Sequence, residues 1–105
     1  MKKLTIDRKT WYRGQRFGAA LRRAEDGKQC CLGFYCVANG ASPEVLVNKG
    51  FPHNLWVNDA WRNMHNVWYY IADINDSTNF RDEQREAYLK VVFREQLQTE
   101  VEFVN

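Results

Sequence analysis

A nearly unbroken apolar run, residues 30–39, constrains the fold of this chain more than any other feature. It reads Cys-Cys-Leu-Gly-Phe-Tyr-Cys-Val-Ala-Asn and is followed by Gly40. A helix that is apolar on most of its surface is a buried one, and a glycine is a common helix stop. We therefore expect a buried helix over 30–39. Gly33 argues against this helix unless another element packs closely there.

Four other segments have strand character. Residues 3–6 and 100–104 alternate between apolar and polar side chains, which is typical of half-buried strands. Asp26-Gly27 lies between two partly apolar runs, and Asp-Gly is a strong hairpin signal. We therefore predict strands over 19–24 and 28–30 around that turn.

Helix signals lie in both halves of the chain. Asp7 can cap a short helix over 8–13, and Ser-Pro at 42–43 is a helix-start signature that leaves room for only one turn. Apolar residues spaced by three and four predict an amphipathic helix within 61–74. Residues 48–59 are rich in Asn, Gly and Pro and are predicted to be a loop.

The last predicted helix spans residues 80–96. Asn79 is its expected cap, and acidic residues follow in the first turn, where the helix dipole favours them. Its expected buried face consists of Ala87, Tyr88, Val91 and Val92.

These elements predict an α+β fold in one small domain, residues 1–105, with a short antiparallel sheet packed against two or three helices. A chain of 105 residues has the length of one domain. Its hydrophobic share of 45% supplies ample material for a core.

The chain is expected to work in the cytoplasm with reduced thiols. Its three cysteines are an odd number, whereas a disulfide framework normally uses an even one. The basic N-terminus is not followed by the apolar stretch of a secretion signal. No window has the apolar length of a membrane span, so a membrane is not among the expected partners.

Basic residues are concentrated at the N-terminal end. Residues 1–28 hold nine Lys or Arg against three acids, whereas 29–105 hold six against ten. An uneven surface of this kind can steer a charged partner.

Several short motifs occur together in a fixed order: Cys-Cys-Leu-Gly-Phe at 30–34, Ile-Asn-Asp at 74–76, Arg85-Glu86, and Val-Glu-Phe-Val at 101–104. This pattern resembles a family of small uncharacterised proteins encoded by phages and prophages, which share CCLG and IND segments. Gln84 stands where that family has Glu. The resemblance implies an accessory protein acting in the host cytoplasm, of the host-takeover or anti-defence kind, and implies no cofactor.

Metal binding is a weak alternative. Cys30, Cys31 and Cys36 with His53 and His65 have the right chemistry for zinc, but not the paired spacing of structural sites. The nearby acids Asp73 and Asp76 suit turn chemistry better than a cation site. We therefore expect no metal and no cofactor.

A cysteine-dependent enzyme is a second alternative. Cys31 near a helix start is a candidate nucleophile, His53 or His65 a candidate base, and Asp59, Asp73 or Asp76 its orienting group. We favour inert, buried cysteines that behave as small hydrophobic residues, and assign no catalytic residue.

A nucleic-acid-binding regulator is the third class. The strip from Trp11 to Phe17 interleaves aromatic rings with Arg13 and Arg16, and such strips can stack bases and hold phosphates. The chain as a whole is less basic than most nucleic-acid-binding domains.

The leading hypothesis is a non-enzymatic protein that binds a host protein or a ligand. Exposed Trp and Tyr residues dominate binding hot spots, and this chain has more large aromatics than a small domain easily hides, so a second copy of the chain is a further candidate partner. Charge complementarity is assigned to Arg13, Arg16, Arg22 and Arg23. The expected aromatic anchors are Trp56, Trp61 and Trp68, with Trp11 beside the arginines.

Overall fold

The computed structural model describes residues 1–17 and 19–105. It has two strands, three α-helices and three short 3-10 helices in this part of the chain. In chain order they are β1 (Lys2–Asp7), α1 (Cys31–Ala38), η1 (Pro43–Leu46), η2 (Pro52–Asn54), η3 (Asp59–Asn63), α2 (His65–Asp76), α3 (Asp82–Leu97) and β2 (Thr99–Val104).

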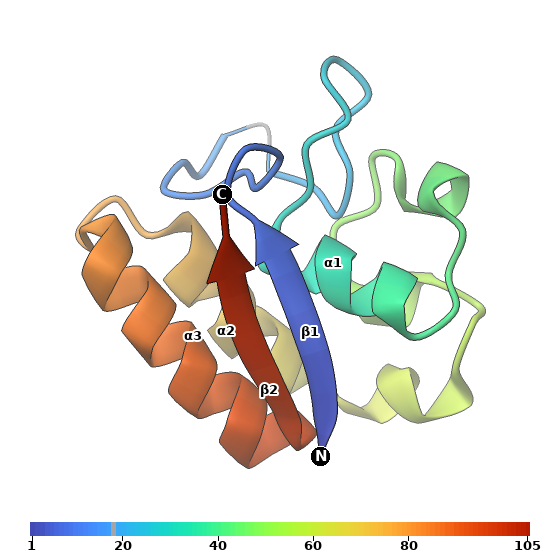
Figure 1. The fold of residues 1–105 in the computed structure, drawn as a ribbon. Coiled ribbons are helices and arrows are strands. Elements are labelled where there is room, and N and C mark those ends of the chain that lie inside the picture. Colours follow the sequence, from blue (N-terminus) through green and yellow to red (C-terminus); the bar gives the residue numbers. More distant parts are fainter. Residues whose placement is uncertain (18) are drawn as a thin grey trace.

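The sheet is parallel, so the predicted antiparallel sheet is wrong. β1 pairs with β2 in a register that runs from Lys2 opposite Thr99 to Asp7 opposite Val104 (Figure 1). Parallel pairs need a long crossover, and here all three helices lie in it. Both strands were correctly expected from their alternating sequences, but a strand pattern does not encode the direction of its partner.

The predicted hairpin accounts for part of this error. The Asp26-Gly27 turn does form, with Gly27 at φ +71° and the Arg23 amide donating to the Lys28 carbonyl at 2.9 Å. The flanking residues then pair elsewhere, because Gln29 bridges to Trp11 and Arg22 bridges to Val47. The turn chemistry was therefore recognised, but its two arms are isolated bridges and not strands.

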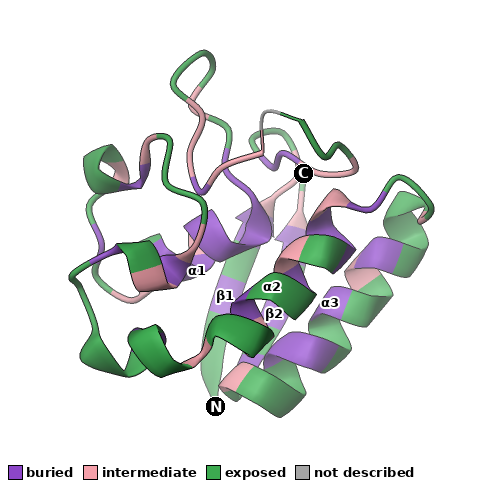
Figure 2. Ribbon diagram, turned by 180° about the vertical axis from the view of Figure 1, so that it is seen from behind, coloured by how far each residue is buried: buried purple, intermediate pink, exposed green. Residues whose placement is uncertain are grey.

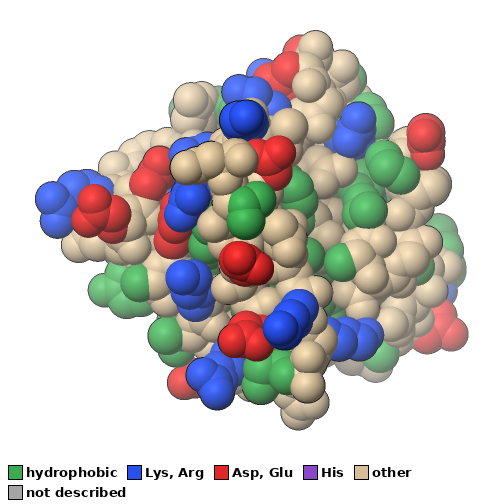
Figure 3. Space-filling view, in the orientation of Figure 1, with side chains coloured by type: hydrophobic (Ala, Val, Ile, Leu, Met, Phe, Trp, Pro, Cys, Tyr) green, Lys and Arg blue, Asp and Glu red, His purple; other side chains and the backbone are tan. Residues whose placement is uncertain are grey.

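The two strands separate a buried face from a solvent face. Leu4, Ile6, Val101 and Phe103 point into the core. Lys3 and Glu100 lie opposite each other on the outer face, where cationic and anionic side chains alternate (Figure 3). α3 lies along the β2 side of the sheet and α1 along the β1 side (Figure 1).

α1 confirms the buried helix that the apolar run predicts. Most of the helix is buried (Figure 2). Gly33 belongs there for a steric reason: a Cβ at this position would lie 1.9 Å from the Leu21 carbonyl oxygen. The sequence allowed a glycine in this helix only if another segment packs closely there. The segment that carries Leu21 does so.

The predicted helix over residues 8–13 is absent from the described chain. The segment turns after β1 and places the buried Trp11 indole against Phe103, with ring centroids 4.9 Å apart. The Tyr12 amide and the Thr10 carbonyl both hydrogen-bond to Gln29. Tertiary packing of the indole therefore overrides the local capping signal.

The segment from 48 to 64 is more ordered than the predicted loop. η2 and η3 lie within it, and the Asn58 side chain caps η3 by accepting from the Ala60 amide at 2.9 Å. α2 starts at His65, four residues after the start of the predicted range 61–74, and continues to Asp76, two residues beyond its end.

α3 confirms the last predicted helix, but of its predicted buried face only Val92 is buried, and its predicted cap is wrong. The cap is Arg81 and not Asn79. The buried residues are Arg85, Leu89, Val92 and Phe93, whereas Tyr88 and Val91 are 50% and 52% exposed. The buried face of α3 therefore includes Arg85, which a prediction from hydrophobicity alone leaves out.

Arg85 is buried because it closes the end of α2. Its guanidinium donates to the carbonyls of Ile74, Asn75, Ser77 and Phe80 at 2.7–3.1 Å. The last carbonyls of a helix have no partner within the helix, and a cation at this end also meets the negative pole of the helix dipole.

Candidate functional site

Two of the four arginines in the predicted basic patch are neutralised within the chain. Arg13 pairs with Asp82 at 3.0 Å, and its guanidinium lies 4.6 Å from the centroid of the Trp11 ring. Arg23 pairs with Glu25 at 2.8 Å and lies 4.1 Å from the Tyr12 ring centroid. Guanidinium groups that are already paired with carboxylates of this chain contribute little to binding phosphates.

Arg16 and Arg22 differ from the other two predicted arginines. Neither forms an ion pair with a residue that the structure describes. The Arg22 guanidinium packs over the turn at Gly27. Arg16 is exposed and lines a small cavity together with Asp76.

Three of the four predicted aromatic anchors are core residues. Trp11, Trp61 and Trp68 are all buried. The Trp68 indole donates to the Trp61 carbonyl at 3.0 Å, and both rings pack on Tyr35 at about 6 Å. Because their rings are inaccessible, these tryptophans cannot serve as contact anchors. Near-helical spacing of aromatics indicates a core here.

Trp56 is the exception, with 85% of its surface exposed. It lies between η2 and η3, and its neighbour Leu55 is buried. We call its surroundings the Trp56 surface, which comprises Val45, Lys49, Leu55, Trp56, Val57 and Arg62. All of these except Arg62 line a hollow of about 340 Å³ together with Asn54.

The segment that carries Trp56 is fixed on both sides. The Asn54 side chain accepts from the Phe51 amide at 3.0 Å, and the Leu55 amide donates to the Pro52 carbonyl at 3.1 Å. The Arg62 guanidinium lies 4.2 Å from the Trp56 ring centroid, which is a cation–π contact. The indole is therefore presented on an ordered turn.

The thiols are poorly suited to nucleophilic chemistry. Burial raises the pKa of the Cys30 thiol to about 12, and it also raises the pKa values of Cys31 and Cys36. Reactive cysteines need the opposite shift. All three thiols are free and buried, as the core interpretation of the apolar run predicts.

The two histidines that were considered as general bases stack on each other. The imidazole centroids of His53 and His65 are 3.9 Å apart, with the rings inclined by 16°. Phe51 and Tyr69 flank this stack. Among the described residues, no three His, Cys, Asp or Glu side chains are grouped so that they could hold a metal ion.

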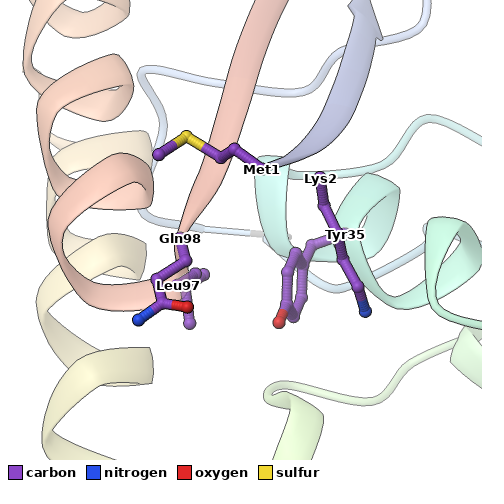
Figure 4. Close-up of a pocket in the computed structure, with 5 residues that line it drawn as sticks. All are labelled: Met1, Lys2, Tyr35, Leu97 and Gln98. Carbon is purple, nitrogen blue, oxygen red and sulfur yellow. The ribbon is translucent and has the colours of Figure 1, made fainter.

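A hollow beside the first residues of β1 carries little chemistry. It measures about 780 Å³ and is lined by Met1, Lys2, Tyr35, Leu97 and Gln98 (Figure 4). Lys2 is its single charged side chain, and its ammonium already donates to Asn39 at 2.9 Å. Nothing in this lining selects a ligand.

Sequence reasoning missed a polar centre, which we call the Asn75 junction. The fully buried Asn75 accepts from the Trp11 indole at 2.8 Å and from the Cys31 amide at 3.0 Å. It donates to the Tyr12 carbonyl at 3.0 Å and to Asp76 at 2.8 Å. The side chain of Asn75 thus caps α1 from another helix, which unites the two sequence motifs. Their joint occurrence was the one available signal.

Comparisons with family models, with curated proteins and with solved structures find no match for this chain. Within the described residues, none of the helices is both long and apolar enough to cross a bilayer.

Proposed function

We propose that this chain is a small accessory protein of the phage type that acts without catalysis, by binding a host protein in the host cytoplasm through the Trp56 surface. The observation that carries the proposal is the exposed Trp56 on an ordered turn. A solvated indole gains free energy when a partner covers it, and tryptophan is among the residues most enriched in binding hot spots.

The setting of Trp56 favours a protein partner. Val45 and Val57 are about half exposed beside it, so the surface is an apolar centre with Lys49 and Arg62 at its rim. Apolar centres with polar rims are typical of protein interfaces. Because Arg62 restrains the indole, less side-chain freedom is lost when a partner binds.

The two alternatives have less support. A nucleic-acid interface on the strip from Trp11 to Phe17 would rest on Arg16 and the 90% exposed Phe17, because Arg13 is paired with Asp82 and the Trp11 and Tyr12 rings are buried. A cysteine nucleophile needs a thiolate, and burial raises the pKa values of all three thiols.

The test compares Trp56→Ala with Tyr88→Ala, which removes a half-exposed aromatic from α3 and serves as the matched control. Host proteins captured by the native chain should be lost with Trp56→Ala and retained with Tyr88→Ala. With the purified partner, calorimetry should show a loss of about 2 kcal/mol or more for Trp56→Ala.

Trp56→Ala should leave the free energy of unfolding within about 0.5 kcal/mol of native, because it removes few buried contacts. A variant that is equally stable and captures the same proteins with the same affinity would refute the proposed role of Trp56.

A further inference from the structure

A second site lies where the start of α1 meets the end of α2. It is a cavity of about 170 Å³ lined in part by Arg16, Ala20, Cys30, Phe51, Ala72 and Asp76. It shares no lining residue with the hollow of the Trp56 surface. The two sequence motifs that meet at the Asn75 junction thus each contribute one wall residue, Cys30 and Asp76.

The carboxylate in this cavity is held in place. Asp76 is the last residue of α2, and its Oδ1 accepts from the Asn75 side chain at 2.8 Å. Because Asn75 is fully engaged in the junction, Asp76 has a defined position. Partial burial raises the pKa of Asp76, so its carboxylate gains from a hydrogen-bond donor or a cation brought beside it.

Arg16 is the cationic residue among those that line this cavity. Arg16 is exposed and makes no hydrogen bond or ion pair with the residues that the structure describes. It also forms no ion pair with Asp76, although both line the same cavity. Opposite charges that share a cavity without touching leave space for a molecule that contacts both.

The remaining walls are small and apolar. Ala19, Ala20 and Ala72 contribute methyl groups, and Phe51 contributes a ring. The volume is below the roughly 300–1,000 Å³ of pockets that hold drug-sized ligands. This is room for a small organic molecule and not for a nucleotide or a sugar.

We infer that this cavity binds a small α-amino acid, with the ammonium group on Asp76, the carboxylate on Arg16 and a short aliphatic side chain against the alanines. A guanidinium and a carboxylate recognise the two charged ends by charge-assisted hydrogen bonds. A divalent cation fits less well, because Asp76 is the single carboxylate among the lining residues.

The test is a titration of the full chain with L-alanine, followed by chemical shifts of the backbone amides. Two matched probes each lack one charged end: propionate has no ammonium, and ethylamine has no carboxylate. We expect saturable shifts at Cys30, Ala72 and Asp76 with L-alanine. Each matched probe should bind about tenfold more weakly or worse, because one charged hydrogen bond is lost.

Variants of the two charged residues complete the test. Arg16→Gln and Asp76→Asn should each weaken L-alanine binding about tenfold or more. Arg94→Gln and Glu95→Gln, two exposed charge removals on α3, should leave it unchanged. If Asp76→Asn disturbs the fold, judged by the dispersion of the amide spectrum, Arg16→Gln decides the question because Arg16 is exposed.

The inference fails if L-alanine gives no saturable shifts, or if Arg16→Gln binds it as tightly as the native chain. Trp56→Ala should titrate like the native chain, which separates this site from the proposed host-protein contact. Loss of one activity without the other would show which of the two proposals is wrong.

Discussion

The Asn75 junction and the Trp56 surface place polar and apolar groups in opposite ways. At the junction a buried amide uses both its donors and both its acceptor positions. At the Trp56 surface a large indole is exposed to water. The polar residue of the Ile-Asn-Asp motif therefore holds the fold together, whereas Trp56, which was predicted as an anchor for a partner, faces solvent.

The two regions should contribute differently to the free energies of folding and of binding. Buried polar groups are costly when a partner is removed, because the group left behind stays desolvated. An exposed indole contributes little to folding and remains available for a partner. Substitutions at the two regions should therefore differ in kind, with loss of stability at one and loss of binding at the other.

The largest effect is expected from Arg85→Ala, beside the junction. It removes the donor to the carbonyls of Ile74, Ser77 and Phe80 and opens a cavity. The Asn75 carbonyl loses one of two donors, because the Gly14 amide still donates to it at 2.8 Å. We expect a loss of about 3–5 kcal/mol in the free energy of unfolding, measured by urea denaturation. Arg81→Ala, an exposed control, should change it by less than about 0.5 kcal/mol. Similar small losses for both variants would contradict the role assigned to Arg85.

A smaller but substantial loss is expected from Gly33→Ala in α1. The added methyl group would lie 1.9 Å from the Leu21 carbonyl oxygen, and that backbone atom must move. We expect a loss of about 2–3 kcal/mol in thermal or urea unfolding. Gly50→Ala is the matched control, since its nearest neighbour would be 3.9 Å away. Equal stability of the two variants would mean that Leu21 yields easily.

The smallest effect is expected from pH, at the stacked histidines beside the segment that carries Trp56. Burial and then His65 lower the pKa of His53 in the folded chain. The unfolded state therefore binds the proton more readily, so stability is full above the ordinary histidine pKa of about 6.5 and falls as the pH drops below it. His53→Gln should flatten the dependence of the urea midpoint between about pH 7 and pH 5. An unchanged slope in this variant would assign the titration to other groups.

The sequence was informative wherever local periodicity decided the outcome. The buried α1 follows from its apolar run, the last helix from the acidic residues of its first turn, and both terminal strands from their alternating side chains. The pairing direction of β1 and β2 did not follow, because it depends on how the whole intervening chain crosses over. The conformation of residues 8–13 was also not predictable locally, because it depends on the packing of the Trp11 indole against Phe103.

The site was harder to predict than the fold, for the same reason. Trp56, Trp61 and Trp68 were all predicted as anchors, although Trp56 lies in the predicted loop and the other two in the predicted amphipathic helix, where they are buried. Arginine is usually a surface residue, but Arg85 is buried because its guanidinium donates to the carbonyls at the end of α2. The cavity between Arg16 and Asp76 joins residues sixty positions apart, which no local pattern reveals.

The pairing of the first strand with the last has a consequence for synthesis on the ribosome. β1 is translated before all three helices, and β2, its strand partner among the described residues, is translated after them. The edge of β1 therefore stays open while the helices are made, and contacts of such long sequence separation form slowly. A nascent chain of this kind should resist proteases only after β2 has left the ribosome, and a chaperone that covers the open edge of β1 would protect it until then.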